Sequence, residues 1–127
     1  KLYEAFSKCA QNGIIASAIS ISKGGLAVAF CKMAMGGKLG LDVSLKKLPG
    51  EFSNDTTALF SESQGRIVAT VAPKHVKKFE KLIVGTNWAK IGMVTKQKKI
   101  VIRGKKNKVI LPVSEALYSY KSTFANY

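Results

Sequence analysis

The chain has few of the side chains that build catalytic centres. Its 127 residues include a single histidine, His75, and only seven acidic residues. None of the acidic residues is spaced as a carboxylate pair or a metal cage. His75 falls in the first turn of a predicted helix and is expected at the surface. We therefore expect neither a self-contained catalytic set nor a metal site in this chain.

Cysteine is also scarce. Cys9 and Cys31 fall in predicted helices, at a spacing that matches no zinc motif and defines no disulfide. Buried, reduced thiols of a cytoplasmic protein are the simplest interpretation. No apolar run is long enough to span a membrane, and the N-terminus does not resemble a signal peptide. Since the chain begins at Lys1 rather than methionine, we expect it to be part of a longer protein.

Negative charge is scarce, and positive charge is abundant. The formal net charge is +14, and seven of the 21 basic residues lie between Lys96 and Lys108. This cluster falls on a predicted hairpin, in which residues 100–102 and 109–111 flank a Gly-Lys-Lys-Asn turn. Solvated charge on a turn and a sheet edge is the favoured interpretation. Nucleic-acid binding is an alternative, although no aromatic residue is interleaved for base stacking, and an acidic protein partner is another.

The hydrophobic patterning predicts one α+β domain over residues 1–127. We expect a mixed or antiparallel β-sheet covered by helices, in a two-layer sandwich. A loop is expected over residues 46–56. Helices are predicted over residues 2–12, 25–35 (closed by Gly36-Gly37), 73–83 and 114–124, and strands over 14–21, 39–45, 66–71, 88–94 and the two arms of the hairpin.

A glycine pair opens the second predicted helix, in the run Ser22-Lys23-Gly24-Gly25. Glycines allow another chain segment or a ligand to approach the backbone closely, and a helix N-terminus favours negative charge. The alternative is a tight strand-to-helix turn without a ligand.

A polar loop, Ser61-Glu62-Ser63-Gln64-Gly65-Arg66, precedes the third predicted strand. Two functional interpretations are open: Glu62 pairs with Arg66, or Ser63 and Gln64 hydrogen-bond a substrate amide or hydroxyl. The alternative is a polar turn that satisfies its own backbone groups.

Several of these segments together carry a family resemblance. The order and spacing of residues 24–37, 40–45, 59–66 and 91–95, followed by residues 113–117, resemble the C-terminal domain of the aminoimidazole ribonucleotide synthetase superfamily. Within that superfamily the chain is similar to the last such domain of the phosphoribosylformylglycinamidine synthases. The resemblance covers nearly the whole chain.

The resemblance implies a domain of an ATP-dependent ligase of purine biosynthesis. That enzyme joins formylglycinamide ribonucleotide, glutamine and ATP to form the amidine, with ADP, phosphate and glutamate as the other products. It implies ATP and magnesium as cofactors of the full enzyme, bound mostly by other domains that also carry the catalytic histidine. The implied partners are those N-terminal domains, a glutaminase subunit and a small accessory subunit, in the cytoplasm. For this domain it implies a structural and interface role.

In the family's internally duplicated chains, the Ser-Glu-Ser-Gln motif of the first copy contacts substrate. The present chain resembles the second copy, so its loop is expected to echo that site. The expected substrate, phosphate or domain-interface residues are Ser22, Lys23, Gly24, Gly25, Glu62, Ser63, Gln64 and Arg66, with no catalytic residue and no metal ligand.

One departure from the family pattern bears on that site. The usual His-Asp-x-Ser-Asp-Gly-Gly run is absent here, since both acids and the histidine are replaced and Lys23 precedes the glycines. The change favours an anion or an acidic neighbour rather than a metal.

Two other functions remain open from the sequence. One is a free-standing basic module that binds nucleic acid through the hairpin. The other is the equivalent domain of a sibling enzyme: selenophosphate synthetase, thiamine-monophosphate kinase or a hydrogenase-maturation factor.

Overall fold

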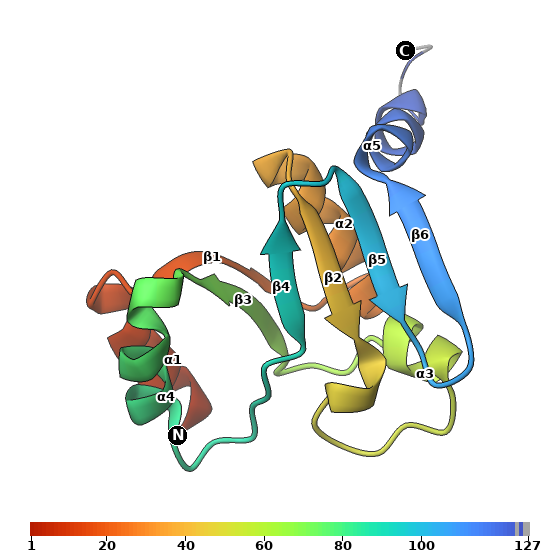
Figure 1. Cartoon of the computed structure of the whole chain (residues 1–127). Coiled ribbons are helices and arrows are strands. Elements are labelled where there is room, and N and C mark those ends of the chain that lie inside the picture. Colours follow the sequence, from red (N-terminus) through yellow and green to blue (C-terminus); the bar gives the residue numbers. More distant parts are fainter. Residues whose placement is uncertain (124, 126–127) are drawn as a thin grey trace.

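The predicted helices and strands occur in the predicted order (Figure 1), although the loop predicted over residues 46–56 begins in a short 3₁₀ turn and ends in the first residues of a helix at Asp55–Phe60. The computed structural model describes residues 1–123 and residue 125. Amphipathic and apolar segments form the helices, and β-branched segments form most strands. The elements are α1 (Leu2–Gln11), β1 (Ile15–Ser20), α2 (Gly25–Gly37), β2 (Gly40–Ser44), η1 (Leu45–Lys47), α3 (Asp55–Phe60), β3 (Ile67–Val71), η2 (Pro73–His75), α4 (Val76–Ile83), β4 (Gly92–Thr95), β5 (Lys99–Arg103), β6 (Lys108–Pro112) and α5 (Val113–Ser122).

The strands pair into two separate sheets. β1 and β3 form an antiparallel ribbon, and β4, β2, β5 and β6 lie side by side in that order. Within the four-stranded sheet β2 and β5 are parallel, whereas β4 with β2 and β5 with β6 are antiparallel. The predicted α+β fold with a mixed sheet and covering helices is therefore confirmed.

Helix α2 holds the main core against one face of the four-stranded sheet. Figure 1 shows α2 behind this sheet, with no helix drawn over the opposite face. Helices α3 and α5 pack against α2. Because α2 is apolar on nearly every side, it can bury side chains toward both the sheet and the two helices. The core includes Leu26, Phe30 and Ala34 of α2, Leu41 and Val43 of β2, Ile100 and Ile102 of β5, and Leu59 of α3.

Helices α1 and α4 pack against each other and contribute a second set of buried residues. Cys9 of α1, Ile83 of α4 and the intervening Ile14 are almost completely buried but lie outside the main cluster. The rings of Phe79 and Trp88 meet edge to face, with centroids 5.6 Å apart. Cys9 is buried as predicted, whereas Cys31 is only half-buried. Burial raises the pKa of both thiols.

Three boundary predictions are wrong. Helix α2 does not close at Gly36-Gly37 but includes both residues, because Lys38 instead takes the left-handed conformation (φ 52°) that ends it. The strand predicted from Leu39 begins at Gly40, because the Leu39 amide donates to the Ala34 carbonyl oxygen in the turn that ends α2, and Leu39 is 42% exposed. The strand predicted from Trp88 begins only at Gly92.

The C-terminal helix is predicted over residues 114–124 and is found over Val113–Ser122. Phe124, the last residue of that prediction, lies outside the described residues. The longest described helix, α2, has 13 residues, and no described helix has the length and apolar character needed to cross a bilayer.

The predicted basic hairpin is present as β5 and β6, and an acidic residue anchors its turn. Both carboxylate oxygens of Asp55 accept hydrogen bonds from the Lys105 amide, at 2.9 and 3.0 Å. The Lys105 ammonium donates to the Phe52 carbonyl oxygen at 3.0 Å. The turn is thereby tied to the segment that leads into α3.

An ion pair joins β2 and β5 on the sheet face opposite α2. The Arg103 guanidinium donates two hydrogen bonds to the Asp42 carboxylate, at 2.9 and 2.7 Å. These bonds, and the nearby charges of Arg103 and Lys108, hold the pKa of Asp42 below its usual value. The same carboxylate raises the pKa of Arg103.

This lowered pKa predicts a pH-dependent contribution to stability. A carboxyl group whose pKa is depressed by folding stabilises the fold above its unfolded pKa of about 3.9, and the stabilisation is lost as the pH falls through its folded pKa. We expect Asp42→Asn to flatten the decrease in thermal stability between about pH 5 and pH 2.5, by a modest amount because the pair is partly exposed. Thermal unfolding followed by circular dichroism measures this.

Glu80→Gln, at an exposed position of α4, is the matched control. The interpretation fails if Asp42→Asn retains the full acid-dependent loss of the unsubstituted chain.

Candidate functional site

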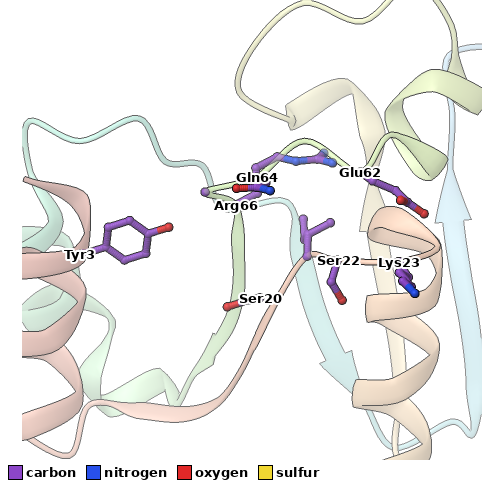
Figure 2. Close-up of a pocket in the computed structure, with 9 residues that line it drawn as sticks. Tyr3, Ser20, Ser22, Lys23, Glu62, Gln64 and Arg66 are labelled. Carbon is purple, nitrogen blue, oxygen red and sulfur yellow. The ribbon is translucent and has the colours of Figure 1, made fainter.

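A polar cleft of about 360 Å³ lies where the two sequence motifs meet (Figure 2). Its walls come from α1, the end of β1, the turn into α2 and the loop between α3 and β3. Figure 2 shows the Tyr3 ring on α1 directed across this space toward the loop. The cleft is lined by Tyr3, Ser20, Ile21, Ser22, Lys23, Glu62, Gln64, Gly65 and Arg66.

The start of α2 is held by a carboxylate of the polar loop. The Gly24 amide donates a hydrogen bond of 2.8 Å to Oε1 of Glu62. Gly24 has φ 80°, and a Cβ at this position would overlap Cγ2 of Val28. Glycine is therefore required by both backbone conformation and space. The negative charge at this helix N-terminus is supplied by the chain itself, in the favourable orientation with respect to the helix dipole.

The second glycine allows two helices to touch backbone to backbone. Gly25 has φ 65°, and a Cβ there would lie 2.5 Å from the Leu59 carbonyl oxygen and 2.9 Å from Cα of Phe60. The segment that approaches Gly25 is thus the end of α3 rather than a ligand. Gly25 itself is buried.

Arg66 organises the loop from within. Its Nε donates to the Ser63 carbonyl oxygen at 3.2 Å, and its Nη2 donates to the carbonyl oxygen and, at 3.1 Å, to Oγ of Ser61. The predicted pairing of Glu62 with Arg66 is wrong, because the Glu62 carboxylate turns to the α2 amide while Arg66 satisfies the loop carbonyls. Among the described residues, no ion pair joins the two side chains.

The structure brings together five of the eight expected site residues at the cleft wall: Ser22, Lys23, Glu62, Gln64 and Arg66. The other three lie beside it. Gly24 and Gly25 shape the backbone beneath the cleft, and the carbonyl of Ser63 accepts from Arg66 without the side chain lining the space.

Tyr3 and Ser20 also line the cleft, and the sequence patterns do not select them. Tyr3 stands outside the apolar stripe of α1, and this aromatic residue at a polar position is the one sequence signal that could have marked it; in the structure it is 64% exposed. Gly65 faces it, since a Cβ on Gly65 would lie 3.8 Å from the Tyr3 hydroxyl oxygen. This contact depends on how α1 is placed, which local sequence does not show.

The donors of the cleft suit an anion better than a cation. Lys23 and Arg66 supply positive charge, and Ser20, Ser22 and Tyr3 supply hydroxyl groups. Its carboxylate, that of Glu62, is engaged by Gly24. The described residues contain no group of three histidine, cysteine or acidic side chains able to hold a metal ion. The described lining residues therefore do not fit a magnesium ion.

The sequence matches a known domain family. The family described as AIR synthase related protein, C-terminal domain, matches residues 1–105. The phosphoribosylformylglycinamidine synthase subunit PurL of Methanococcus aeolicus is 32% identical over 126 residues, which cover 98% of this chain and 17% of that protein. PurL of Lactobacillus helveticus is 35% identical over 96 residues, which cover 76% of this chain and 12% of that protein. The chain thus spans less than a fifth of the length of these relatives.

Solved structures share the fold. PurL of Thermotoga maritima complexed with FGAR has a TM-score of 0.78 and 21% sequence identity, covering 91% of this chain and 20% of that chain. The PurLQS structure of the same organism has a TM-score of 0.77 and 22% identity, covering 91% of this chain and 21% of that chain.

The contact between Gly25 and α3 predicts a large cost for a single methyl group. Gly25→Ala should lower the free energy of unfolding by about 2–4 kcal/mol, because the left-handed backbone and the overlap with the Leu59 carbonyl both oppose it. Gly36→Ala is the matched control, since Gly36 is helical and a methyl group added there would have nothing within 4 Å of it. That control should stabilise by about 0.5–1 kcal/mol. Urea unfolding distinguishes the two, and equal effects would contradict the expected crowding at Gly25.

The Glu62 hydrogen bond gives a second prediction. Glu62→Ala should destabilise the chain by about 1 kcal/mol and speed hydrogen exchange of the Gly24 amide. Glu62→Gln should restore part of the protection, because its amide oxygen still accepts. Gln64→Ala, in the same loop, is the control and should leave the Gly24 amide unchanged. Unaltered exchange in Glu62→Ala would show that the bond does not hold the helix start.

Proposed function

We infer that this chain, which belongs to the AIR synthase related protein C-terminal domain family, is the C-terminal domain of a PurL-type phosphoribosylformylglycinamidine synthase. The observation that carries this inference is the 32% identity to a PurL over 98% of the chain. The whole enzyme would convert formylglycinamide ribonucleotide, glutamine and ATP into the amidine, ADP, phosphate and glutamate. Residues 1–127 act as one domain of that ligase.

Within the enzyme the chain serves as scaffold and as one wall of a ligand site. Lys23 and Arg66 line the polar cleft with Ser20 and Ser22, and this positive charge supports a phosphate group of the ribonucleotide or nucleotide as the ligand. Among the described lining residues, no hydrogen bond joins a hydroxyl group to the Lys23 amine or the Glu62 carboxylate. Bond making would therefore belong to groups of the other domains.

ATP and magnesium would be cofactors of the full enzyme. PurL of T. maritima has been solved in complexes with ATP, AMPPCP and ADP. ATP would be the substrate that is converted to ADP and phosphate. The described side chains of this domain do not fit a magnesium ion, so its ligands would come from outside it.

The partners would be the N-terminal domains of the same enzyme, a glutaminase subunit and a small accessory subunit. The T. maritima PurLQS structure supports such an assembly for the relative. Purine synthesis would place the protein in the cytoplasm.

The test uses the full-length protein that contains this chain. With ammonium as nitrogen donor, ATP and formylglycinamide ribonucleotide, it should form the amidine and ADP in equal amounts. Lys23→Glu should raise KM for the ribonucleotide or for ATP by about tenfold with little change in kcat, since it removes binding charge rather than a reacting group.

Lys77→Glu, an equal charge change at an exposed position of α4, is the control and should not alter either KM. Absence of amidine formation would refute the enzymatic assignment. Equal KM effects of the two variants would refute the role of the cleft while leaving the assignment intact.

A further inference from the structure

Helix α3 connects the turn between β5 and β6 to the polar cleft. Its first turn lies beside the β5–β6 turn (Figure 1), and its last residue leads directly into the polar loop at the cleft wall. With six residues, α3 is too short to be stable as an isolated helix. Its position is therefore set by contacts with the rest of the fold rather than by its own stability.

The contact at the first turn of α3 is made by Asp55. Its carboxylate accepts hydrogen bonds from the Lys105 amide through both oxygens, and a Cβ on Gly104 would overlap this carboxylate. Gly104 does not adopt the left-handed conformation, so the close approach of Asp55, and not the backbone angle, favours glycine there. The Lys105 ammonium also binds the carbonyl oxygen of Phe52, just before the helix. The hairpin turn thus holds α3 at its beginning.

The contact at the last turn of α3 is made with the start of α2. The Leu59 carbonyl oxygen approaches Gly25 too closely for any side chain at that position. Ser61, the first residue of the polar loop, donates its amide to the Thr57 carbonyl oxygen, and its own carbonyl accepts from Arg66. A shift of α3 would therefore move the polar loop relative to the start of α2.

We propose that Asp55 is a positioning residue for the polar cleft. By fixing α3 to the β5–β6 turn, it sets the position of the loop from which Glu62 reaches the Gly24 amide. The effect on ligand binding rests on the proposed function, whereas the effect on the loop does not.

An acidic residue in the first turn of a helix also interacts favourably with the helix dipole. That general effect would not depend on the residue at position 104. Variants of Asp55 and of Gly104 therefore separate the two roles, because the second breaks the same contact without changing any charge.

The test measures amide hydrogen exchange in the ¹⁵N-labelled chain. Asp55→Ala and, separately, Gly104→Ala should each speed exchange of the Ser61 and Gly24 amides by about tenfold. The Ile14 amide, in the second set of buried residues, is the reference for global unfolding and should change less than about twofold. Asp55→Asn, which keeps one acceptor oxygen, should restore part of the protection.

Asp42→Asn is the matched control, since this carboxylate also binds β5 but on the sheet face opposite α2. It should leave the Ser61 and Gly24 amides unchanged. Adding Gly104→Ala to Asp55→Ala should increase the effect of Asp55→Ala by less than about twofold, because the carboxylate that the methyl group would overlap is already absent.

Kinetics of the full-length enzyme give a second readout. Asp55→Ala and Gly104→Ala should each raise the same KM as Lys23→Glu by about fivefold, with kcat changed less than about twofold. If Lys23→Glu raises that KM and neither of these variants does, the role of Asp55 at the cleft is refuted while the proposed function stands. Absence of amidine formation would refute the proposed function alone, and the exchange data would still decide whether Asp55 positions the loop.

Three exchange results would overturn the proposal. The first is unchanged exchange of the Ser61 and Gly24 amides in Asp55→Ala. The second is equal acceleration at Ile14, which would show that Asp55 stabilises the whole fold without positioning the loop. The third is full additivity of Asp55→Ala and Gly104→Ala, which would show that the two residues act independently.

Discussion

The bond between the Gly24 amide and the Glu62 carboxylate connects the parts of the molecule that matter for function. It fixes the first turn of α2, the helix on which the main core is built. It also holds the loop that carries Arg66 over the end of β1, and so defines two walls of the polar cleft. Because the Glu62 carboxylate occupies the N-terminus of α2, the Gly24 amide is already satisfied within the chain.

Much of the architecture could be predicted from the sequence, because the hydrophobic pattern within each segment indicates a helix or a strand. Helix α1 and the β5–β6 hairpin each carry a clear periodicity, and both are found where they were expected. The ends of helices and strands were harder to predict, since they depend on the residues packed around them. Helix α2 continues through Gly36 and Gly37, because Lys38 rather than a glycine takes the left-handed conformation that ends it. Trp88 packs on Phe79, and the strand that its β-propensity suggested starts later.

The candidate site was predictable as two motifs but not as a geometry. Their family spacing selected Lys23, Glu62 and Arg66, which do line one cleft. The partner of Glu62 was not predictable from local sequence, because the Gly24 amide that it binds lies 38 residues away in the chain, whereas Arg66 lies in the same loop. Tyr3 was not predicted for a related reason. It lies on α1, which precedes both motifs in the chain, and it reaches the cleft only through the packing of that helix.

The central position of β2 has a consequence for synthesis on the ribosome. Its two neighbours in the sheet, β4 and β5, both follow it by about fifty residues or more, with Leu41 paired to Val94 and to Ile100. The hydrophobic strand and its helix α2 are therefore translated long before any strand can pair with β2. Folding of this region must wait for the C-terminal third of the chain, and its high contact order favours slow assembly. During that interval the apolar α2 is the segment most in need of protection from aggregation.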